Sequence, residues 1–469
     1  MSKIEVNQIS SQCGSTLTIG QSGDTVTLAC GATQTGFGRT GTVDWDTTAK
    51  TASFTAVSGN GYFINTTSGT VTMTLPASPS AGDIVAINDY ARTFATNNLT
   101  VDRNGSNIQG IASNATFSTD GQSTTFIYVD GTKGWIPTED QTTNIYGATF
   151  ITASGGTVTT IGDFKVHAFT GPGTFTVCSV GNPAGSNTIE TMIVAGGGGA
   201  GFDRAGGAGA GGMILTPTCG IPVSATSYPI AIGGGGAGIP NSLGPGAHCG
   251  CNGSNSTGFA LTAIGGGSTS RGGNSMPLEQ VTGNPGGSGG GGGGGCGTVG
   301  PGGTATQPTQ PGNSGTFAFA NPGGNAAGPG MQTGGGGGAG SAGVNAVNGT
   351  SSGNGGAGKD VSPRFGTAPQ PFYQADGPLQ GASASGIFAG GGGGGGSTGA
   401  SAPSTSGGNG GPGGGGHGGD SPSNPGDRDG HPGTTNTGGG GGGSSNISSS
   451  PDAGGNGGSG IVLIRYKYQ

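Results

Sequence analysis

Charged side chains are scarce in this chain of 469 residues: Asp, Glu, Lys and Arg together make up 7%, and the net charge is −7. Nucleic-acid-binding proteins need a basic surface that neutralises phosphates, so this class is excluded. Disordered chains of low hydrophobicity usually carry a high net charge, which this chain lacks. The scarcity of charge therefore favours a folded protein with no nucleic-acid partner.

Long apolar segments and a disulfide framework are also missing. The longest apolar stretches, such as Ile461 to Ile464, are far too short to span a bilayer. The first residues, Met1 to Val6, lack the apolar core of a signal peptide. The seven cysteines are an odd number scattered along the chain, which does not indicate a disulfide framework. We therefore expect synthesis in a cytosol, no membrane insertion, and an extracellular role only by a route other than secretion.

Catalytic and metal-binding motifs are sparse as well. The four histidines are His167, His248, His417 and His431. None lies in a recognisable Ser-His-Asp context. Residues 417–431 gather possible metal ligands, but their spacing matches no standard site, and a solvated polar loop is the simpler interpretation. Residues 248–251 could bind zinc together with Cys219 and Cys296, or form a disulfide with one of them. We expect no enzyme activity, no cofactor and no metal.

Glycine, by contrast, is abundant: the chain contains 118, most of them after residue 190, against an average usage of about 7%. They form unbroken runs at residues 196–199, 233–236, 289–295, 334–338, 390–396, 413–416 and 438–443. Collagen needs a glycine at every third position, so consecutive glycines exclude it. A flexible linker and a packed bundle of polyproline-II-like glycine helices remain as alternatives.

The last strand favours the packed bundle. Residues 461–466 are strongly apolar, and a disordered tail has no reason to end in such a strand. Left-handed extended helices have three residues per turn, and without side chains they can approach until backbone groups bond between them. Ordering so much glycine costs a large entropy, so many helices must pack together. We expect a polyglycine bundle inserted between a strand at 189–195 and the strand at 461–466, which pair with each other.

The remaining sequence predicts an all-β fold, because helix formers are sparse and short alternating segments bounded by turn residues recur. Three domains are expected: a β-prism-like attachment and oligomerisation segment (1–41), a β-sandwich-like domain (42–140), and a glycine-rich domain (141–469). The third has framing strands in 148–195 and 460–469 around the polyglycine-II bundle at 196–459.

Two further expectations concern the first 140 residues. The short N-terminal strands cannot bury a face within one chain, which favours a parallel homotrimer. Trp45 and Trp135 bracket the second domain, and we expect both to be core anchors.

Several motifs resemble proteins of phage particles. Residues 69–83, together with Asn104-Gly105 and with Tyr128-Val129-Asp130-Gly131 before Gly134-Trp135, resemble a module common in tail fibre and virion structural proteins of marine and cyanobacterial phages. The opening residues 3–9 are similar to fibre N-termini of the same viruses. Residues 192–199, with the closing residues 460–466, resemble the glycine-rich domain of phage fibres. Glycine-helix sandwiches also occur in tip adhesins of some T-even-like phages.

This resemblance implies a structural virion protein that is made in the host cytoplasm. The first interpretation is a trimeric tail fibre or adhesin, which joins other virion proteins through its N-terminal segment and a host cell-surface protein or glycan through its glycine-rich end. The second is a capsid decoration or head-fibre protein. The third is a polysaccharide depolymerase spike, which would need a cluster of acidic residues that the sequence does not show.

Aromatic residues between the glycine runs are the candidate receptor-binding positions. A glycine bundle offers few side chains, so its aromatics must lie at edges and tips. They either cap the bundle against water or form a contact patch, since aromatics and Arg supply interface hot spots. The candidates are Phe317, Phe319, Arg364, Phe365, Phe372, Tyr373 and Phe388. The loop that carries Arg364 to Tyr373 is the leading candidate, because it joins aromatic surface to a positive charge.

Overall fold

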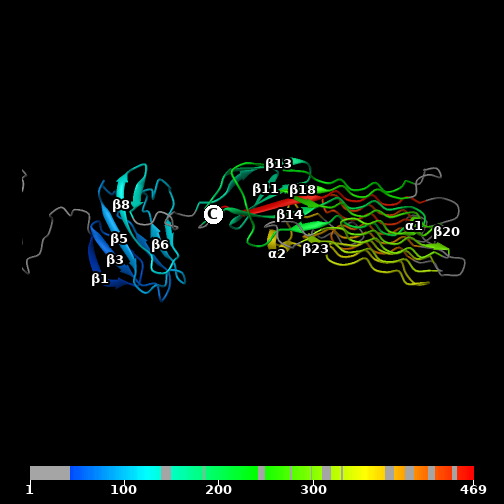
Figure 1. Cartoon of the computed structure of the whole chain (residues 1–469), viewed down its shortest axis with the longest axis horizontal. Helices are drawn as coiled ribbons and strands as arrows, with labels where there is room; N and C mark the ends of the chain where they lie inside the picture. The colour runs from blue at the N-terminus through cyan, green and yellow to red at the C-terminus, as the bar shows by residue number, and fades with distance from the viewer. Residues whose placement is uncertain are drawn as a thin grey trace, which may run out of the picture. The chain divides into compact units, whose positions relative to one another are not determined.

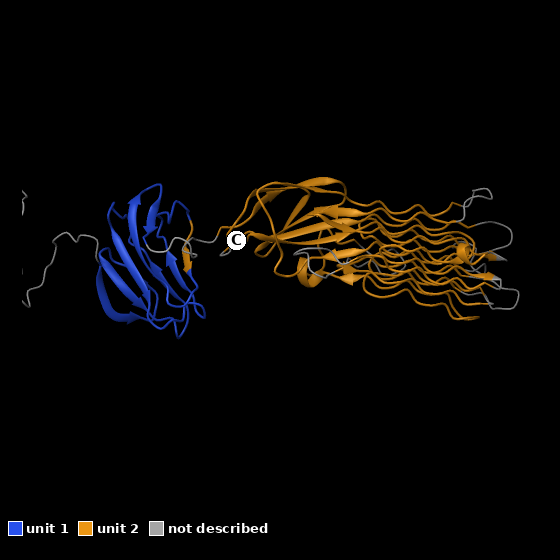
Figure 2. Ribbon diagram, viewed as in Figure 1, with its two compact units in different colours: residues 1–112, 117–145 blue, residues 113–116, 146–469 orange. Residues whose placement is uncertain are grey.

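The computed structural model describes residues 43–138, 149–182, 185–240, 249–274, 277–296, 298–308, 318–328, 331–374, 385–396, 406–420, 428–445 and 452–469. They divide into two compact units, residues 43–112 with 117–138 and residues 113–116 with the part after 148 (Figure 2). The expected segment 1–41 lies outside the described residues. The described residues form β-strands and two four-residue helices, which confirms the all-β prediction, and they include no helix long and apolar enough to cross a membrane.

The first unit contains two sheets. The five-stranded sheet has the order β1 (Asp44–Lys50), β3 (Asn60–Ile64), β5 (Ile84–Asp89), β8 (Ser123–Asp130), β9 (Gly134–Pro137). The four-stranded sheet has the order β2 (Phe54–Thr55), β4 (Val71–Thr74), β6 (Leu99–Asp102), β7 (Ala115–Phe117). From β1 to β6 the chain alternates between the two sheets, so that β1, β3 and β5 run parallel, as do β2, β4 and β6.

Aromatic side chains fill the core of the first unit. Phe117 of β7 packs edge-on against Phe126 of β8, with ring centroids 6.0 Å apart, which joins the two sheets. Trp135 is fully buried, as expected of a core anchor. Trp45 is 43% exposed, because β1 is the edge strand of its sheet, where the indole packs against Phe63 of β3. The expected core position is therefore wrong for Trp45.

The second unit contains a large antiparallel sheet with the order β11 (Thr157–Ile161), β12 (Phe164–Phe169), β25 (Ile461–Lys467), β14 (Thr188–Val194), β15 (Met213–Leu215), β22 (Ala318–Phe319). A further strand, β16 (Ile221–Pro222), also pairs with β14. A smaller sheet has the order β10 (Thr152–Ser154), β13 (Gly173–Ser179), β17 (Ser227–Ile230). Short pairs are β18 (Ser256–Gly258) with β19 (Leu261–Ala263), β20 (Gly273–Asn274) with β21 (Gly295–Cys296), and β23 (Lys359–Asp360) with β24 (Ile387–Phe388). The helices are α1 (Leu278–Val281) and α2 (Ser362–Phe365).

The strands that frame the glycine region are neighbours in the large sheet. β14 and β25 pair antiparallel, from Glu190 opposite Arg465 to Val194 opposite Ile461. This pairing was expected from the sequence and is confirmed. The chain leaves the sheet after β14 into the glycine segments and returns at β25 (Figure 1).

Both faces of this sheet are buried at β14 and β25, because alternate residues of these two strands enter two separate cores. On β25, Ile461 and Leu463 lie in one core, whereas Val462 and Ile464 lie in the other. The first core is completed by residues of the 361–388 loop, and the second by residues of the three-stranded sheet and β19. Strands buried on both faces are expected to be apolar along their whole length, as residues 461–464 are.

Backbone hydrogen bonds between glycine segments repeat every third residue. In the run 390–396, the amides of residues 390, 393 and 396 donate to the carbonyls of residues 413, 416 and 419. The amides of 391 and 394 donate to residues 356 and 353, and those of 392 and 395 to residues 208 and 205. This segment therefore bonds three neighbours in turn, with the three-residue period of a polyproline-II helix. Buried backbone groups are satisfied in this way without a sheet.

The segments pack so closely that side chains are excluded between them. A Cβ atom placed on Gly391, Gly392, Gly393 or Gly395 would lie 1.9–2.1 Å from a backbone oxygen of a neighbouring segment. The segments run side by side from β14 and β23 at one end to α1 and β20 at the other (Figure 1). We call these the framing end and the far end of the bundle.

Candidate recognition surfaces

The aromatic residues of the 361–388 loop lie in a core. Phe365, Phe372, Tyr373 and Phe388 are between 1% and 5% exposed, and they pack in the cluster that covers one face of β14 and β25. The loop lies at the framing end of the bundle, where α2 and β23 are seen (Figure 1). These four side chains therefore cap the bundle against water, which is the alternative left open above, and they offer no accessible contact patch.

The other candidates differ in position. Phe319 of β22 is half-buried, and the Lys359 ammonium lies 4.9 Å from the centroid of its ring. Phe317 lies outside the described residues. Burial raises the pKa of the Tyr373 phenol, whose hydroxyl donates to the Gly366 carbonyl at 2.7 Å. This hydrogen bond satisfies the one polar atom that Tyr373 brings into the core.

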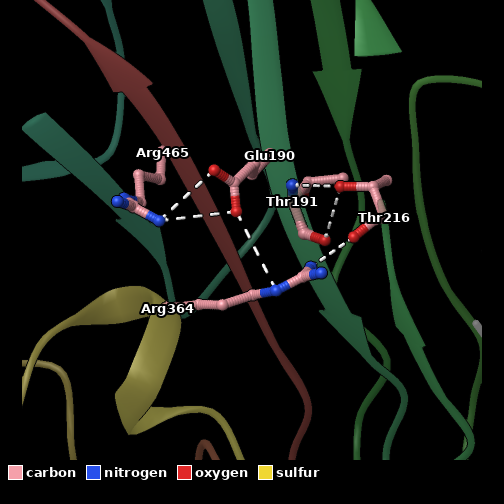
Figure 3. A network of polar contacts seen from close by, with 5 residues as sticks. All are labelled: Glu190, Thr191, Thr216, Arg364 and Arg465. Atoms are coloured by element: carbon pink, nitrogen blue, oxygen red, sulfur yellow. Dashed lines mark hydrogen bonds and ion pairs between the residues drawn. The ribbon is translucent and has the colours of Figure 1, made fainter. Parts of the chain in front are cut away.

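Arg364 points back into the protein, toward a carboxylate (Figure 3). Its Nε lies 4.0 Å from Oε2 of Glu190 on β14, and its Nη1 donates a hydrogen bond to the Thr216 carbonyl. Arg465 of β25 approaches both oxygens of the same carboxylate, at 3.3 and 3.4 Å. The Thr216 hydroxyl also accepts a hydrogen bond from the Thr191 amide at 2.8 Å. Arg364 thus fastens α2 to the large sheet.

The charges of this network are compensated within the protein. Burial raises the pKa of the Glu190 carboxyl, and the positive charges of Arg465 and Arg364 oppose that shift. The Arg465 guanidinium also stacks on Phe164, 3.6 Å from the ring centroid. A cavity of about 280 Å³ lies beside Glu190 and Arg465. Its lining therefore includes a carboxylate and a guanidinium that are already paired with each other. We interpret the network as structural.

The far end of the bundle carries a charged turn. Asp203 and Arg204 both have a positive φ, of 59° and 58°, so the chain reverses there between two glycine segments. Arg271 lies 3.5 Å from the Asp203 carboxylate and 4.9 Å from the centroid of the Phe202 ring. The Arg271 side chain is 32% exposed, so this corner presents a guanidinium on an aromatic ring to solvent.

Exposed apolar side chains accompany this turn at the far end. Leu278 of α1 is 53% exposed, and Val299, which pairs with Gly294 beside β21, is 45% exposed. Val347 is 54% exposed and begins a turn in which the Gly349 amide donates to the side chain of Gln332. Large apolar residues on a surface formed mostly of glycine are candidate contact points.

A groove opens near the framing end, on the side of the three-stranded sheet. Its volume is about 700 Å³, and its lining includes Ile221, Pro222, Tyr228, Thr257, Phe259 and Thr262. The rings of Tyr228 and Phe259 lie 4.9 Å apart at an angle of 41° and are both half-buried. We call this the Tyr228–Phe259 groove. Sequence reasoning missed it, because its aromatic residues lie in separate segments and no turn motif marks Phe259.

Metal ligands do not gather in the part of the chain that the structure describes. Groups of three or more His, Cys, Asp or Glu able to hold one ion are not found there. Cys178, Cys219, Cys249 and Cys251 have free, exposed thiols. The possible disulfide between Cys219 and Cys249 or Cys251 is therefore not formed. His248 and the side chain of Cys296 lie outside the described residues, so the possible zinc site and the disulfide with Cys296 stay untested.

Comparison with protein families identifies a glycine-rich domain. A family model described as a glycine-rich domain matches residues 168–467, from β12 to the end of β25. The match thus spans the framing strands and the whole bundle between them. No curated protein matches the chain.

Proposed function

The chain belongs to the glycine-rich domain family, and from that premise we propose that it is a structural virion protein, a trimeric phage tail fibre or adhesin whose glycine-rich end recognises the host. The resemblance of residues 3–9 and 69–83 to phage fibre modules supports the virion assignment. In this proposal residues 1–41 form the trimer and join the particle.

One observation carries the adhesin function: the bundle is a scaffold from which side chains are excluded. Its segments bond through backbone groups, and a Cβ atom would collide with a neighbour at most of its glycines. Such a scaffold holds its turns rigidly but offers little chemistry along its sides. Recognition on rigid scaffolds is usually carried by the loops. We therefore propose that the receptor surface lies at the far end, around Arg271, Leu278 and Val347.

The corresponding experiment alters exposed residues of the far end. Leu278→Ser with Val347→Ser should reduce adsorption of phage to host cells without changing particle yield, because neither side chain contributes to a core. Val158→Ser is the matched control: this valine is 48% exposed, but it lies on β11 in the framing sheet. Equal adsorption of the wild-type particle, the double variant and the control would place the receptor surface elsewhere.

Two alternatives remain distinguishable. A capsid decoration or head-fibre protein would tolerate deletion of the whole glycine region with no loss of adsorption, and a particle reconstruction would locate it on the head. A polysaccharide depolymerase spike would shorten host polysaccharide, which can be followed by gel filtration. Light scattering that gives a stable monomer for the full chain would contradict the trimer.

A further inference from the structure

We propose that the Tyr228–Phe259 groove binds a neutral pyranose sugar. The inference concerns this groove alone and holds whether or not the chain is an adhesin. The groove has the volume of a small-molecule site, about 700 Å³. It lies on β16 to β19, outside both the glycine bundle and the loop that caps it.

The first observation is a strained turn that displays Phe259. β18 and β19 form a hairpin in which Gly258 pairs with Leu261, leaving a two-residue loop. Phe259 and Ala260 have φ values of 54° and 59°, which define a type I′ turn. Such turns favour Asn-Gly, and a bulky residue with positive φ is an outlier. Strain of this kind collects at functional sites, and here it projects an aromatic ring beside a groove.

The second observation is that both rings are fixed before any ligand arrives. The Tyr228 hydroxyl accepts a hydrogen bond from the Ser224 amide at 2.8 Å. Phe259 packs edge-on against the fully buried Phe175, with centroids 5.9 Å apart. Binding therefore costs little side-chain entropy, which favours affinity for a small ligand.

The chemistry of the lining selects the ligand. Among the described residues that line the groove, the Tyr228 phenol is the sole ionisable group, so a charged ligand would find no counter-ion. The two rings offer apolar faces, and Thr257 of β18 offers a hydroxyl beside them. A pyranose has matching surfaces: a face of C–H bonds and an edge of hydroxyls. A lipid chain would make no use of the Thr257 hydroxyl.

Saturation-transfer NMR on the full chain tests the proposal with four probes: methyl glucopyranoside, methyl galactopyranoside, methyl mannopyranoside and the charged sugar galacturonate. At least one neutral glycoside should bind, and more tightly than galacturonate. The double variant Phe259→Asn/Ala260→Gly should weaken that binding by about tenfold or more. The same variant should keep its fold, because the favoured Asn-Gly turn offsets part of the packing that Phe259 loses against Phe175. Loss of binding in a variant that still shows a cooperative melting transition separates recognition from misfolding.

Two further variants sharpen the result. Tyr90→Ala removes an aromatic residue that is 61% exposed in the first unit, and it should bind sugar as the wild type does. Phe259→Leu keeps an apolar side chain but removes the ring face, and it should bind as poorly as the double variant. The proposal is overturned if no neutral glycoside binds, if galacturonate binds best, or if either Phe259 variant keeps wild-type affinity. No host cell enters this assay, so its outcome is separate from that of the adhesin proposal.

Discussion

Replacing Gly392 with valine should strongly destabilise the second unit, because the site has no room for a side chain. A Cβ atom on Gly392 would lie 2.0 Å from the carbonyl oxygen of Gly441, in a neighbouring segment. Its φ is not in the left-handed region, so valine could adopt the backbone conformation. The cost is therefore one of packing between segments.

The magnitude follows from the contacts that must open. Gly392 donates to Ala208 at 2.9 Å and accepts from Gly336 at 2.8 Å, and Gly441 donates to Gly198 at 3.0 Å. A retreat of Gly441 by about 1 Å stretches such bonds beyond hydrogen-bonding range. Overpacking costs about 1–3 kcal/mol, and each lost hydrogen bond costs about 1 kcal/mol. We expect a loss of about 3–5 kcal/mol and a melting temperature lower by roughly 10 °C.

Differential scanning calorimetry of the full chain measures this change. Gly234→Val is the matched control, because Gly234 belongs to another glycine run, is exposed, and would have nothing within 4 Å of its Cβ. The control should change stability by less than about 1 kcal/mol. Equal melting temperatures for the two variants would refute the packed bundle and favour a flexible linker.

Three other changes are expected. His167 is buried with Nδ1 2.6 Å from the Gly155 carbonyl and Nε2 3.1 Å from the Tyr466 hydroxyl, and burial lowers its pKa. The unfolded chain therefore binds a proton more readily, so urea titrations should show that the free energy of unfolding falls as pH drops below about 6.5. This fall should be smaller in His167→Gln. Glu190→Gln leaves two guanidinium groups without a carboxylate and should cost about 2–4 kcal/mol in the same titrations, whereas no loss would contradict a structural network. Hydrogen exchange should show protected amides at residues 390–396, and free exchange there would contradict the inter-segment bonds.

The framing strands could be predicted from local sequence alone. Residues 461–464 are apolar without interruption, which is typical of a strand buried on both faces, and Ile461 and Val462 do enter opposite cores. The glycine runs similarly predict their own packing, because segments without side chains can bury their backbone groups by hydrogen bonding to adjacent segments.

The roles of single aromatic residues could not be predicted in this way. Phe365 and Phe372 are buried because their loop folds onto β14 and β25, which are remote in the sequence. Trp45 is exposed because β1 is an edge strand, and strand order is a property of the whole sheet. The type I′ turn at Phe259 has neither Asn nor Gly at its centre, so no local signal marks it.

The close approach of the glycine segments also limits how this chain can vary over generations. Every substitution of a glycine adds a Cβ atom, and at most glycines of the bundle that atom would strike a neighbouring segment. We therefore expect such substitutions to be disfavoured, whatever amino acid they introduce. We expect sequence variation mainly in the turns, where single residues can change without disturbing the packing of the segments. The fold thus combines an interior that tolerates few substitutions with turns that tolerate many.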